Sequence, residues 1–259
     1  MSLRALLASE TLPIGHMIFE FATPGIGMLA RNAGADFLLF DLEHSGFTFE
    51  TAKHAVVSAR AAGLPLVVRV PSHDSKDLAR ACDIGADGVM APLVHSADEA
   101  RAIVAAVKYP PTGRRGVGQV QMHDRYRFGP FAEKARAANE ALAVFLQIES
   151  AEGAAAAEAI ASVPGVDCLW IGHMDLSCSL GAPAQFDTPA FKDAVDNVLS
   201  ATRRHGIRSG RLARNADEGA ALAKAGFDCL ALSSDSQTYL AALTQGISDL
   251  RSRLPGARP

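Results

Sequence analysis

Val166-Asp-Cys-Leu-Trp-Ile-Gly-His-Met-Asp-Leu-Ser177 is the stretch of sequence on which the fold assignment depends. Residues 168–171 form a short apolar run, which is typical of a β-strand buried on both faces. The run breaks at Gly172, and Asp175 stands where the next helix would begin. One strand earlier, Val144-Phe-Leu-Gln-Ile-Glu149 has the same form, an apolar run that ends in a carboxylate. Two carboxylates at the ends of successive parallel strands can converge on one divalent cation.

Short apolar runs recur along the whole chain, and alanine-rich segments with helical spacing separate them. The helical spacing is clearest at 97–107, 190–203 and 217–224. Eight alternating strand–helix units predict an α/β fold closed into a (β/α)8 TIM barrel. A doubly wound open sheet is the alternative, which is weakened because no GxGxxG motif follows an early strand. The expected strands lie at 14–19, 37–40, 66–70, 89–92, 144–148, 168–171, 207–212 and 229–232.

A glycine follows three of the expected helices, at Gly34, Gly85 and Gly226. Glycine at this position is typical of a helix that ends in a left-handed conformation. Each of these turns also supplies an aspartate shortly before the next strand. Because no linker or low-complexity segment interrupts the pattern, we treat residues 1–259 as a single domain and expect a flexible tail at about 255–259.

The chain has 259 residues, a net charge of −3 and a pI of about 6.2, which gives no electrostatic reason to expect nucleic acid or an acidic membrane surface as a partner. No apolar segment approaches the roughly 18 residues that a membrane span needs, and residues 1–11 lack the apolar stretch of a signal peptide. The four cysteines show no CxxC spacing, which favours buried, reduced thiols. We therefore expect a cytoplasmic globular protein with no membrane or nucleic-acid partner.

Residues 109–139 break the alternation of strands and helices. Pro110 and Pro111 precede a glycine-rich stretch that ends at Gly118, and a polar, aromatic segment follows at 123–128. Glycine and proline disfavour a long helix here. Long ordered loops often act as lids or contact surfaces, so we expect one of these roles, with a flexible surface insert as the alternative.

Charged side chains stand at the carboxyl ends of the expected strands, where residues of a TIM barrel face a ligand. Glu149 and Asp175 supply hard oxygen donors and are candidate ligands for Mg²⁺ or Mn²⁺. Two carboxylates leave about four of six octahedral positions for water and substrate, which describes a catalytic site. Gln147 shares strand parity with Glu149 and would add an amide beside the metal. The alternative for each acid is a helix N-cap or a partner of a nearby arginine.

Two further polar groups complete the expected site. Arg69 would neutralise charge on an oxygen beside the metal, and the alternative is an interior salt bridge with Asp41 or Glu43. His44 titrates near neutral pH and follows a strand end, as a general base requires. All lysines fall on expected helices or their flanks, so none is placed for Schiff-base chemistry, and the absence of GxSxG argues against a serine hydrolase.

Six short motifs occur along the chain, in the order Asp41-Leu-Glu-His44, Val68-Arg69-Val-Pro71, Asp83-Ile-Gly85, Arg115-Gly-Val-Gly118, Gln147-Ile-Glu149 and Ile171-Gly-x-x-Asp175-Leu-Ser177. With this set of motifs, the chain resembles the HpcH/HpaI family of metal-dependent class II pyruvate aldolases over nearly its whole length. The resemblance implies a lyase that cleaves or forms a 4-hydroxy-2-keto acid through a pyruvate enolate, giving pyruvate and an aldehyde. It also implies a divalent metal (Mg²⁺, Mn²⁺ or Co²⁺), no organic cofactor, and a homo-oligomer, trimer or hexamer, in which the last helix packs on a neighbouring subunit.

The resemblance implies a role for each matching residue. Glu149 and Asp175 would bind the metal. Arg69 would stabilise the enolate, and His44, supported by Asp41, would transfer protons. The remaining implied roles are substrate binding by Gln147, Gly172, His173, Met174, Asp175 and (on the aldehyde side) Leu212, and a contribution from the adjacent subunit by Asp83, Gly116, Val117 and Gly118.

Three positions depart from the family pattern. The family usually has proline where this chain has His173, and it is generally apolar where this chain has Arg211. The segment Phe19-Glu20-Phe21 is also unusual. These departures concern the identity of the substrate more than the metal.

Three other functions stay open at this point. A citryl- or malyl-CoA-type lyase of the same superfamily would need a basic groove for the CoA phosphates. A phosphate-binding isomerase barrel without a metal would use Ser209-Gly210 and Ser233-Ser234 as phosphate loops. An inactive barrel that only binds or assembles would fold normally and show no metal-dependent turnover.

Overall fold

Eight parallel strands pair in sequence order and close on themselves, as predicted for a TIM barrel. The computed structural model describes residues 2–254, so the tail expected at 255–259 lies outside the described residues. Each expected strand is present, with boundaries within two residues of their expected positions. The strands are β1 (Ile14–Ile18), β2 (Phe37–Asp41), β3 (Leu66–Arg69), β4 (Gly88–Ala91), β5 (Ala143–Ile148), β6 (Cys168–Ile171), β7 (Arg208–Ala213) and β8 (Cys229–Ser234).

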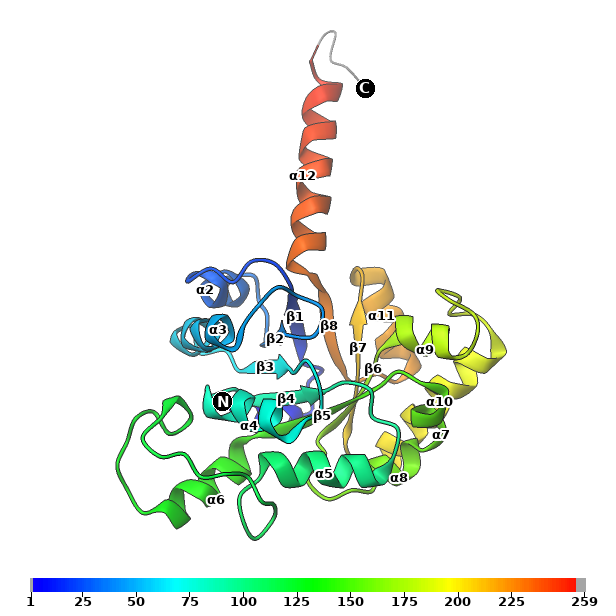
Figure 1. The fold of residues 1–259 in the computed structure, drawn as a ribbon. Helices are drawn as coiled ribbons and strands as arrows, with labels where there is room; N and C mark the ends of the chain where they lie inside the picture. The colour runs from blue at the N-terminus through cyan, green and yellow to red at the C-terminus, as the bar shows by residue number, and fades with distance from the viewer. Residues whose placement is uncertain (1, 255–259) are drawn as a thin grey trace.

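Helices follow the strands and surround the barrel (Figure 1). The helix predicted at 97–107 is α5, and the helices predicted at 190–203 and 217–224 are α10 and α11, each slightly longer than expected. The helices are α1 (Leu3–Leu7), α2 (Ile26–Asn32), α3 (Phe49–Ala61), α4 (Ser75–Asp83), α5 (Ala97–Val107), α6 (Phe131–Ala141), α7 (Ala151–Ala155), α8 (Ala157–Ala161), α9 (His173–Ser179), α10 (Pro189–His205), α11 (Ala216–Ala225) and α12 (Asp235–Ser252), with a short 3-10 helix η1 (Met122–Asp124).

The segment 109–139 connects α5 to β5 and is partly helical. The break in the alternation expected at 109–139 extends only to Pro130, and the last third of the segment is helical, because α6 begins at Phe131. Pro130 is the N-cap of α6 and precedes its first turn, a position at which proline does not interrupt helical hydrogen bonds. The remainder, which contains η1, is the longest irregular connection in the barrel.

The predicted glycine turns have the predicted geometry. Gly34, Gly85 and Gly226 adopt φ angles of 92°, 91° and 109°, in the region that favours glycine. The aspartates of the turns have a shared role that the sequence pattern did not reveal, because each accepts a backbone hydrogen bond at the start of a neighbouring strand. The pairs are Asp36 with Ile14, Asp87 with Leu66, Asp167 with Val144, and Asp228 with Ser209.

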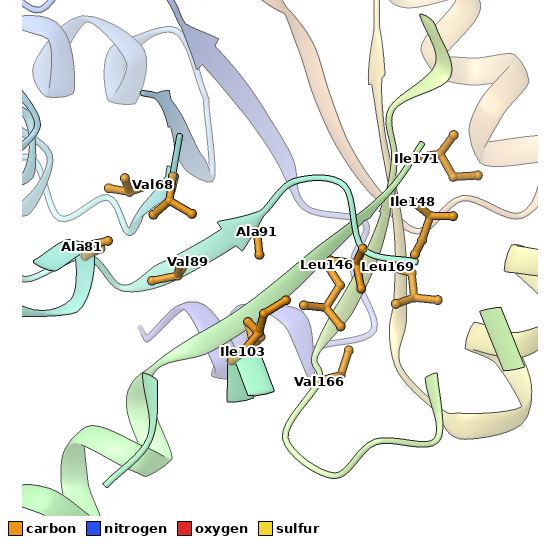
Figure 2. Close-up of a cluster of buried hydrophobic side chains, with 14 of the residues drawn as sticks. Val68, Ala81, Val89, Ala91, Ile103, Leu146, Ile148, Val166, Leu169 and Ile171 are labelled. Carbon is orange, nitrogen blue, oxygen red and sulfur yellow. The ribbon is translucent and has the colours of Figure 1, made fainter. Parts of the chain in front are cut away.

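Side chains alternate between the barrel interior and the helical layer along each strand. The outward-facing set packs against the helices and forms the large core, part of which Figure 2 shows around Val68, Leu146 and Ile171. The interior set is a separate, smaller cluster of buried side chains. Its members are Leu3, Leu6, Leu7, Met17, Phe37, Leu39, Val67, Met90, Ala143, Phe145, Cys168, Trp170, Cys229 and Ala231.

Two interior positions are glycine because aromatic rings fill the space beside them. A Cβ atom on Gly15 would overlap the ring of Phe37, and one on Gly210 would overlap the ring of Trp170. The rings therefore take up the volume at the barrel axis that larger side chains would otherwise occupy, which closes the lower part of the barrel.

Helix α12 points away from the barrel instead of packing along it (Figure 1). It carries a row of exposed apolar side chains, with Leu240 at 65% and Leu250 at 59% exposure. An apolar groove of about 950 Å³ lies between its first turns, α2 and the end of β8. Within residues 2–254, no helix combines the length and the apolarity that crossing a membrane requires.

Candidate active site

Polar side chains gather at the carboxyl ends of β2, β3 and β5, on the interior side of the barrel. Asp41 and Arg69 are the last residues of β2 and β3, and Gln147 lies near the end of β5. Each of the three has the same strand parity as the interior apolar residues earlier in its strand. The three polar side chains therefore also face the interior, at the carboxyl end of the hydrophobic cluster. Phe19 and Leu212 pack against the top of the same interior cluster.

Arg69 is held by two carboxylates and an amide. Its Nε lies 2.5 Å from Oδ1 of Asp41, and its Nη1 lies 3.2 Å from Oε2 of Glu43. Nη1 also donates to Oε1 of Gln147 at 3.4 Å. The interior salt bridge that the sequence left as an alternative role for Arg69 is therefore present, with both acids. It holds the guanidinium in the strand-end layer beside Gln147, so the salt bridge and a role at the site are compatible.

Glu149 follows β5 and is buried at the same rim. Its Oε1 accepts the backbone N–H of Leu93 at 2.7 Å, and its Oε2 accepts a hydrogen bond from the amide of Gln147. Gln147 lies on the same side as Glu149, as their shared parity predicts, and in the structure it connects Arg69 to Glu149. Leu93 has a φ of 53°, a left-handed conformation that turns its N–H toward the carboxylate.

Asp175 lies in the first turn of α9, where the sequence predicts it, and its side chain is exposed. Burial raises the pKa of Glu149, and the negative charge of Asp175 raises it further, while the hydrogen bonds from Gln147 and Leu93 lower it. A cation between the two carboxylates would relieve this repulsion, which fits a divalent metal. That the two acids share one ion stays a prediction.

The donor set at the rim is suited to an open metal site. Among residues 2–254, no group of three or more histidine, cysteine, aspartate or glutamate side chains is arranged to hold a metal ion. An ion at Glu149 and Asp175 would therefore take its other ligands from water and substrate. Such open coordination is found in catalytic sites, whereas structural sites are closed by protein ligands.

Gly172 closes the site from the β6 side. A Cβ atom there would lie 2.8 Å from Cβ of Glu149 and would also press on the Gln147 amide nitrogen, at 3.0 Å. Only glycine lets the backbone that enters α9 approach the carboxylate so closely. The sequence identified Gly172 as a break in an apolar run, and the structure gives the reason for the break.

Glu43 is a site residue that the sequence interpretation used only as a possible partner of Arg69. Burial raises its pKa to about 7, Arg69 opposes that rise, and the charges of Glu149 and Asp41 add to it. Its Oε2 has no hydrogen-bond partner, although it faces Arg69 at 3.2 Å. The sequence contained a signal that Glu43 belongs to the site, because it lies two residues after Asp41 and so has the same strand parity at the end of β2.

His44 lies at the outer edge of the site, with 61% of its side chain exposed. Asp41 accepts the backbone N–H of His44 at 2.8 Å, and that of Glu43 at 3.1 Å. The acid nearest to the His44 imidazole is Glu43, with 3.9 Å between Nε2 and Oε2. Asp41 thus supports the backbone of His44 in the single chain, and proton transfer by His44 stays a prediction.

Asp83 and residues 116–118, predicted to act in an adjacent subunit, do not join the rim of their own chain. Asp83 ends α4, and a helix that follows a parallel strand ends at the amino side of the barrel. Arg115 lies beside Asp83 there, with Nη2 2.6 Å from Oδ1. Any role of these residues at a carboxyl-end site needs a second chain, so it stays a prediction.

The two departures at His173 and Arg211 turn out to be neighbours. The His173 ring packs edge-on against Phe186 at 5.3 Å, and the Arg211 guanidinium lies 5.5 Å from the same ring. Burial and the nearby Arg211 charge lower the pKa of His173 to about 4, so its imidazole is neutral at pH 7. Arg211 is buried and faces Glu218 at 3.5 Å. His173 is the first residue of α9, and Met174, the next residue, is 48% exposed.

Two of the alternative chemistries do not fit the geometry. Ser209 and Gly210 lie inside β7, where Gly210 faces the Trp170 ring, so they do not form the phosphate loop proposed for an isomerase. No lysine lies on β1–β8. Lys108 is buried, but it lies outside the barrel, where its Nζ donates to the carbonyls of Asn139 and Leu142 at 2.7 and 2.6 Å.

Comparison with known proteins gives one consistent family. The HpcH/HpaI aldolase/citrate lyase family matches residues 22–242. A 2-dehydro-3,6-dideoxy-6-sulfogluconate aldolase from Pseudomonas putida is 35% identical over 92% of this chain and 95% of its own length. A hydroxypyruvate/pyruvate aldolase from Paraburkholderia phytofirmans is 34% identical over 94% of this chain and 95% of its own length. The crystal structure of an HpcH/HpaI aldolase from Desulfitobacterium hafniense DCB-2 superposes with a TM-score of 0.93, at 31% identity and 100% coverage of both chains.

Proposed function

This chain belongs to the HpcH/HpaI aldolase/citrate lyase family, and on that premise we propose that it is a divalent-metal-dependent aldolase acting on 4-hydroxy-2-keto acids through a pyruvate enolate. The products of cleavage are pyruvate and an aldehyde. The observation that carries the proposal is the continuous network from Asp41 through Arg69 and Gln147 to Glu149, buried at the carboxyl rim of the barrel. A cation and an oxyanion would lie side by side there, which is what enolate chemistry requires.

Glu149 and Asp175 would hold the metal. When bound there, a divalent cation acts as a Lewis acid that polarises the keto oxygen of the substrate. The protein orients Glu149 in advance, because Leu93 N–H and the Gln147 amide each bind one of its oxygens. Hydrogen bonds to a ligating carboxylate fix the direction in which it presents its free lone pairs.

Arg69 would stabilise the negative oxygen that develops during carbon–carbon cleavage. Its position is set before substrate arrives, since Asp41 and Glu43 hold Nε and Nη1. A donor that is already oriented costs no reorganisation in the transition state, and such donors are each worth about 3–4 kcal/mol in other enzymes. Gln147 would keep the guanidinium and the metal carboxylate at a fixed separation.

The carboxylate of the keto acid would bind at the start of α9. The backbone N–H groups of His173, Met174 and Asp175 lie in the first turn of this helix, where amides are free of intrahelical partners. His173 is held neutral, so it adds no charge that would compete for that carboxylate. Leu212, half-buried at the end of β7, would face the aldehyde portion.

During cleavage, His44 would take the proton of the C4 hydroxyl of the keto acid, whose oxygen becomes the aldehyde carbonyl, and it would return that proton in the reverse reaction. Its exposed imidazole at the rim can reach solvent and substrate, and Glu43, with a pKa of about 7, lies 3.9 Å from it. A histidine beside a carboxyl whose pKa is raised to about 7 forms a suitable acid/base pair. The Asp41 carboxylate contributes by fixing the backbone of both residues.

We also propose that the chain assembles as a homo-oligomer through α12. The helix exposes Tyr239, Leu240, Leu243, Ile247 and Leu250, and it borders an apolar groove whose barrel wall includes Ile26 and Leu29. An amphipathic helix that leaves its own barrel uncovered is the arrangement expected when a second copy covers both. A trimer or hexamer would in addition bring Asp83 and residues 116–118 toward a neighbouring site.

The four cysteines are free thiols, which supports the proposal of a reducing, cytoplasmic location. Cys82, Cys168 and Cys229 are buried within the core and are not available for pairing with another protein.

The test is the release of pyruvate from a panel of 4-hydroxy-2-keto acids, measured before and after EDTA treatment and after addition of Mg²⁺, Mn²⁺ or Co²⁺. We expect turnover that is lost on chelation and restored by a divalent cation. The panel should include substrates with a terminal sulfonate, carboxylate or methyl group, since the relatives include aldolases named for a sulfogluconate, a glucarate and a methyl-oxoglutarate. Full turnover after chelation would overturn the metal mechanism.

A further inference from the structure

The first residue of α12, Asp235, binds the connection between β1 and α2. Its Oδ1 accepts the backbone N–H of Phe19 at 3.0 Å, and its Oδ2 accepts those of Glu20 at 2.9 Å and Phe21 at 2.7 Å. Asp235 is only 6% exposed. Three successive amides on one buried carboxylate fix the backbone of this segment, since each N–H would otherwise lack a partner.

A second contact joins the same two elements. The ring of Tyr239 meets the ring of Phe21 edge-on, with 5.5 Å between the centroids. Tyr239 and Asp235 are four residues apart on α12, so both lie on one face of the helix. The start of α12 therefore holds segment 19–21 by its backbone and by one of its side chains.

The held segment carries an aromatic ring to the active site. Phe19 follows β1 and packs on top of the interior cluster, and its centroid lies 5.8 Å from Cζ of Arg69. The guanidinium is bounded on its other sides by Asp41, Glu43 and Gln147. Phe19 is thus the apolar wall of the pocket that holds Arg69, at the distance of a weak cation–π contact.

We propose that Asp235 is a positioning residue for Arg69, which it serves by fixing segment 19–21 and so keeping the Phe19 ring against the guanidinium. The inference rests on the proposed role of Arg69 in stabilising the enolate. It also assigns a purpose to the Phe19-Glu20-Phe21 segment, which departs from the family pattern. We propose above that α12 packs on a second copy of the chain. Asp235, the first residue of that helix, would therefore link the orientation of α12 to the shape of the site.

The isosteric change Asp235→Asn tests this directly. Both oxygens of Asp235 accept N–H groups, Oδ1 from Phe19 and Ser236 and Oδ2 from Glu20 and Phe21. An asparagine must place its NH₂ group against one of these pairs of donors, whichever way it is turned. At least one pair of amides loses its acceptor, while the volume of the side chain is unchanged.

Two measurements do not depend on turnover. Hydrogen–deuterium exchange at the amides of 19–21 should be about ten-fold faster in Asp235→Asn than in the wild type, as expected for the loss of a hydrogen bond, with exchange in β5 unchanged. Modification of Arg69 by phenylglyoxal, located by mass spectrometry, should be several-fold faster in Asp235→Asn. It should also be faster in Phe19→Ala, which removes the wall without loosening the segment.

Kinetics complete the test. Because Arg69 acts on charge that develops in the transition state, both variants should lower kcat for keto-acid cleavage about ten-fold with KM changed less than two-fold. The matched control is Asp249→Asn, an exposed aspartate on the same helix that accepts a side-chain hydrogen bond from Gln245. It should leave exchange, labelling and kcat at wild-type values.

Unchanged exchange at 19–21 in Asp235→Asn would overturn the proposal at its first step. Faster exchange without faster labelling of Arg69 would overturn it at the second, because the segment would then move without affecting the guanidinium. If the wild-type protein cleaves no 4-hydroxy-2-keto acid, the proposed function fails, and the exchange and labelling results still decide whether Asp235 positions Arg69.

Discussion

The Nε atom of Arg69 lies 2.5 Å from Oδ1 of Asp41, and both side chains are buried at the ends of adjacent strands. Asp41 and Arg69 are register partners in the β2–β3 ladder, so the sheet itself places them side by side. Asp41 also accepts the N–H groups of Glu43 and His44. The Asp41 carboxylate therefore fixes both the Arg69 guanidinium and the backbone of Glu43 and His44, the two candidate proton carriers.

Arg69→Ala should lower turnover at least 100-fold, since a preoriented donor to a developing oxyanion is lost. It should also lower the free energy of unfolding by about 3–5 kcal/mol, because Asp41 is left buried without its partner. Steady-state kinetics and urea denaturation measure the two effects. The matched control is Arg101→Ala, which breaks an exposed ion pair with Asp98 and should change the free energy of unfolding by less than about 1 kcal/mol.

Glu149→Gln and Asp175→Asn should fold normally and weaken the binding of Mn²⁺ at least 10-fold, as titration calorimetry would measure. Each change removes one anionic ligand and keeps the shape of the side chain. Turnover should fall with metal occupancy in both variants. Glu152→Gln, on the exposed surface of α7, serves as the control and should bind Mn²⁺ as the wild type does. Wild-type Mn²⁺ affinity in either site variant would contradict the assignment.

Glu43 should make the metal-free protein less stable as the pH rises. Its folded-state pKa of about 7 lies above the ordinary value of 4.5, so between these pH values the folded state keeps a proton that the unfolded state has lost. Stability therefore falls as the pH rises from about 4.5 to about 7. Glu43→Gln stays neutral and should remove this decline, leaving the variant on the order of 1–3 kcal/mol more stable at pH 8, relative to pH 4.5, than the wild type.

Denaturation in EDTA at a series of pH values measures this difference. Glu50→Gln, at an exposed position in the first turn of α3, should keep the wild-type pH profile. The assignment fails if the Glu43→Gln and wild-type profiles run parallel between pH 4.5 and 8.

Gly210→Ala should destabilise the barrel by about 1–3 kcal/mol, because the added methyl overlaps the Trp170 ring in a closely packed interior. Gly219→Ala is the opposite case. Gly219 lies within α11, and its added Cβ would meet only Ala213 at 3.6 Å, an ordinary contact. That variant should be more stable by about 0.5–1 kcal/mol, the usual gain for alanine over glycine in a helix. Thermal unfolding of the two variants should therefore shift in opposite directions.

Leu240→Lys should lower the molar mass of the protein in solution, because a charge would enter the apolar face of α12 that we propose to be covered by a second copy. Gln245→Lys, on the opposite face of the same exposed helix, is the control for added charge and should keep the wild-type mass. Light scattering after gel filtration measures both. A wild-type protein that is monomeric at micromolar concentration would contradict the assembly proposal.

Most of the fold was predictable because it depends on local signals. Apolar runs bounded by glycine turns located every strand to within two residues, since a buried parallel strand needs nothing more than a short apolar segment between turns. Gly34, Gly85 and Gly226 adopt the left-handed conformations expected from their positions. The helix α6 was missed because the irregular structure expected from the glycines and prolines before Pro130 was also assigned to the residues after it. Those residues have an ordinary helical composition.

The site was predictable where it followed from strand parity. Asp41, Arg69, Gln147 and Glu149 meet because each occupies an interior position at a strand end, and parity fixes that from sequence alone. The sequence offered Asp41 or Glu43 as alternative partners of Arg69 and did not decide between them. Arg69 turned out to bind both Asp41 and Glu43, and the raised pKa of Glu43 arises from burial that only the closed barrel provides.

The sequence by itself determined the alternation of strands and helices and the identity of the polar residues at the strand ends, because periodicity and turn chemistry act between near neighbours. The open sheet stayed an alternative until the pairing of β1 with β8 closed the barrel. Tertiary structure alone decided the direction of α12 and the separation of Asp83 from the rim of its own chain. It also decided the hydrogen bond from the Phe19 N–H to Asp235, which is 216 residues away. Contacts at such separations depend on how the ring of strands closes, and no local pattern of residues encodes that distance.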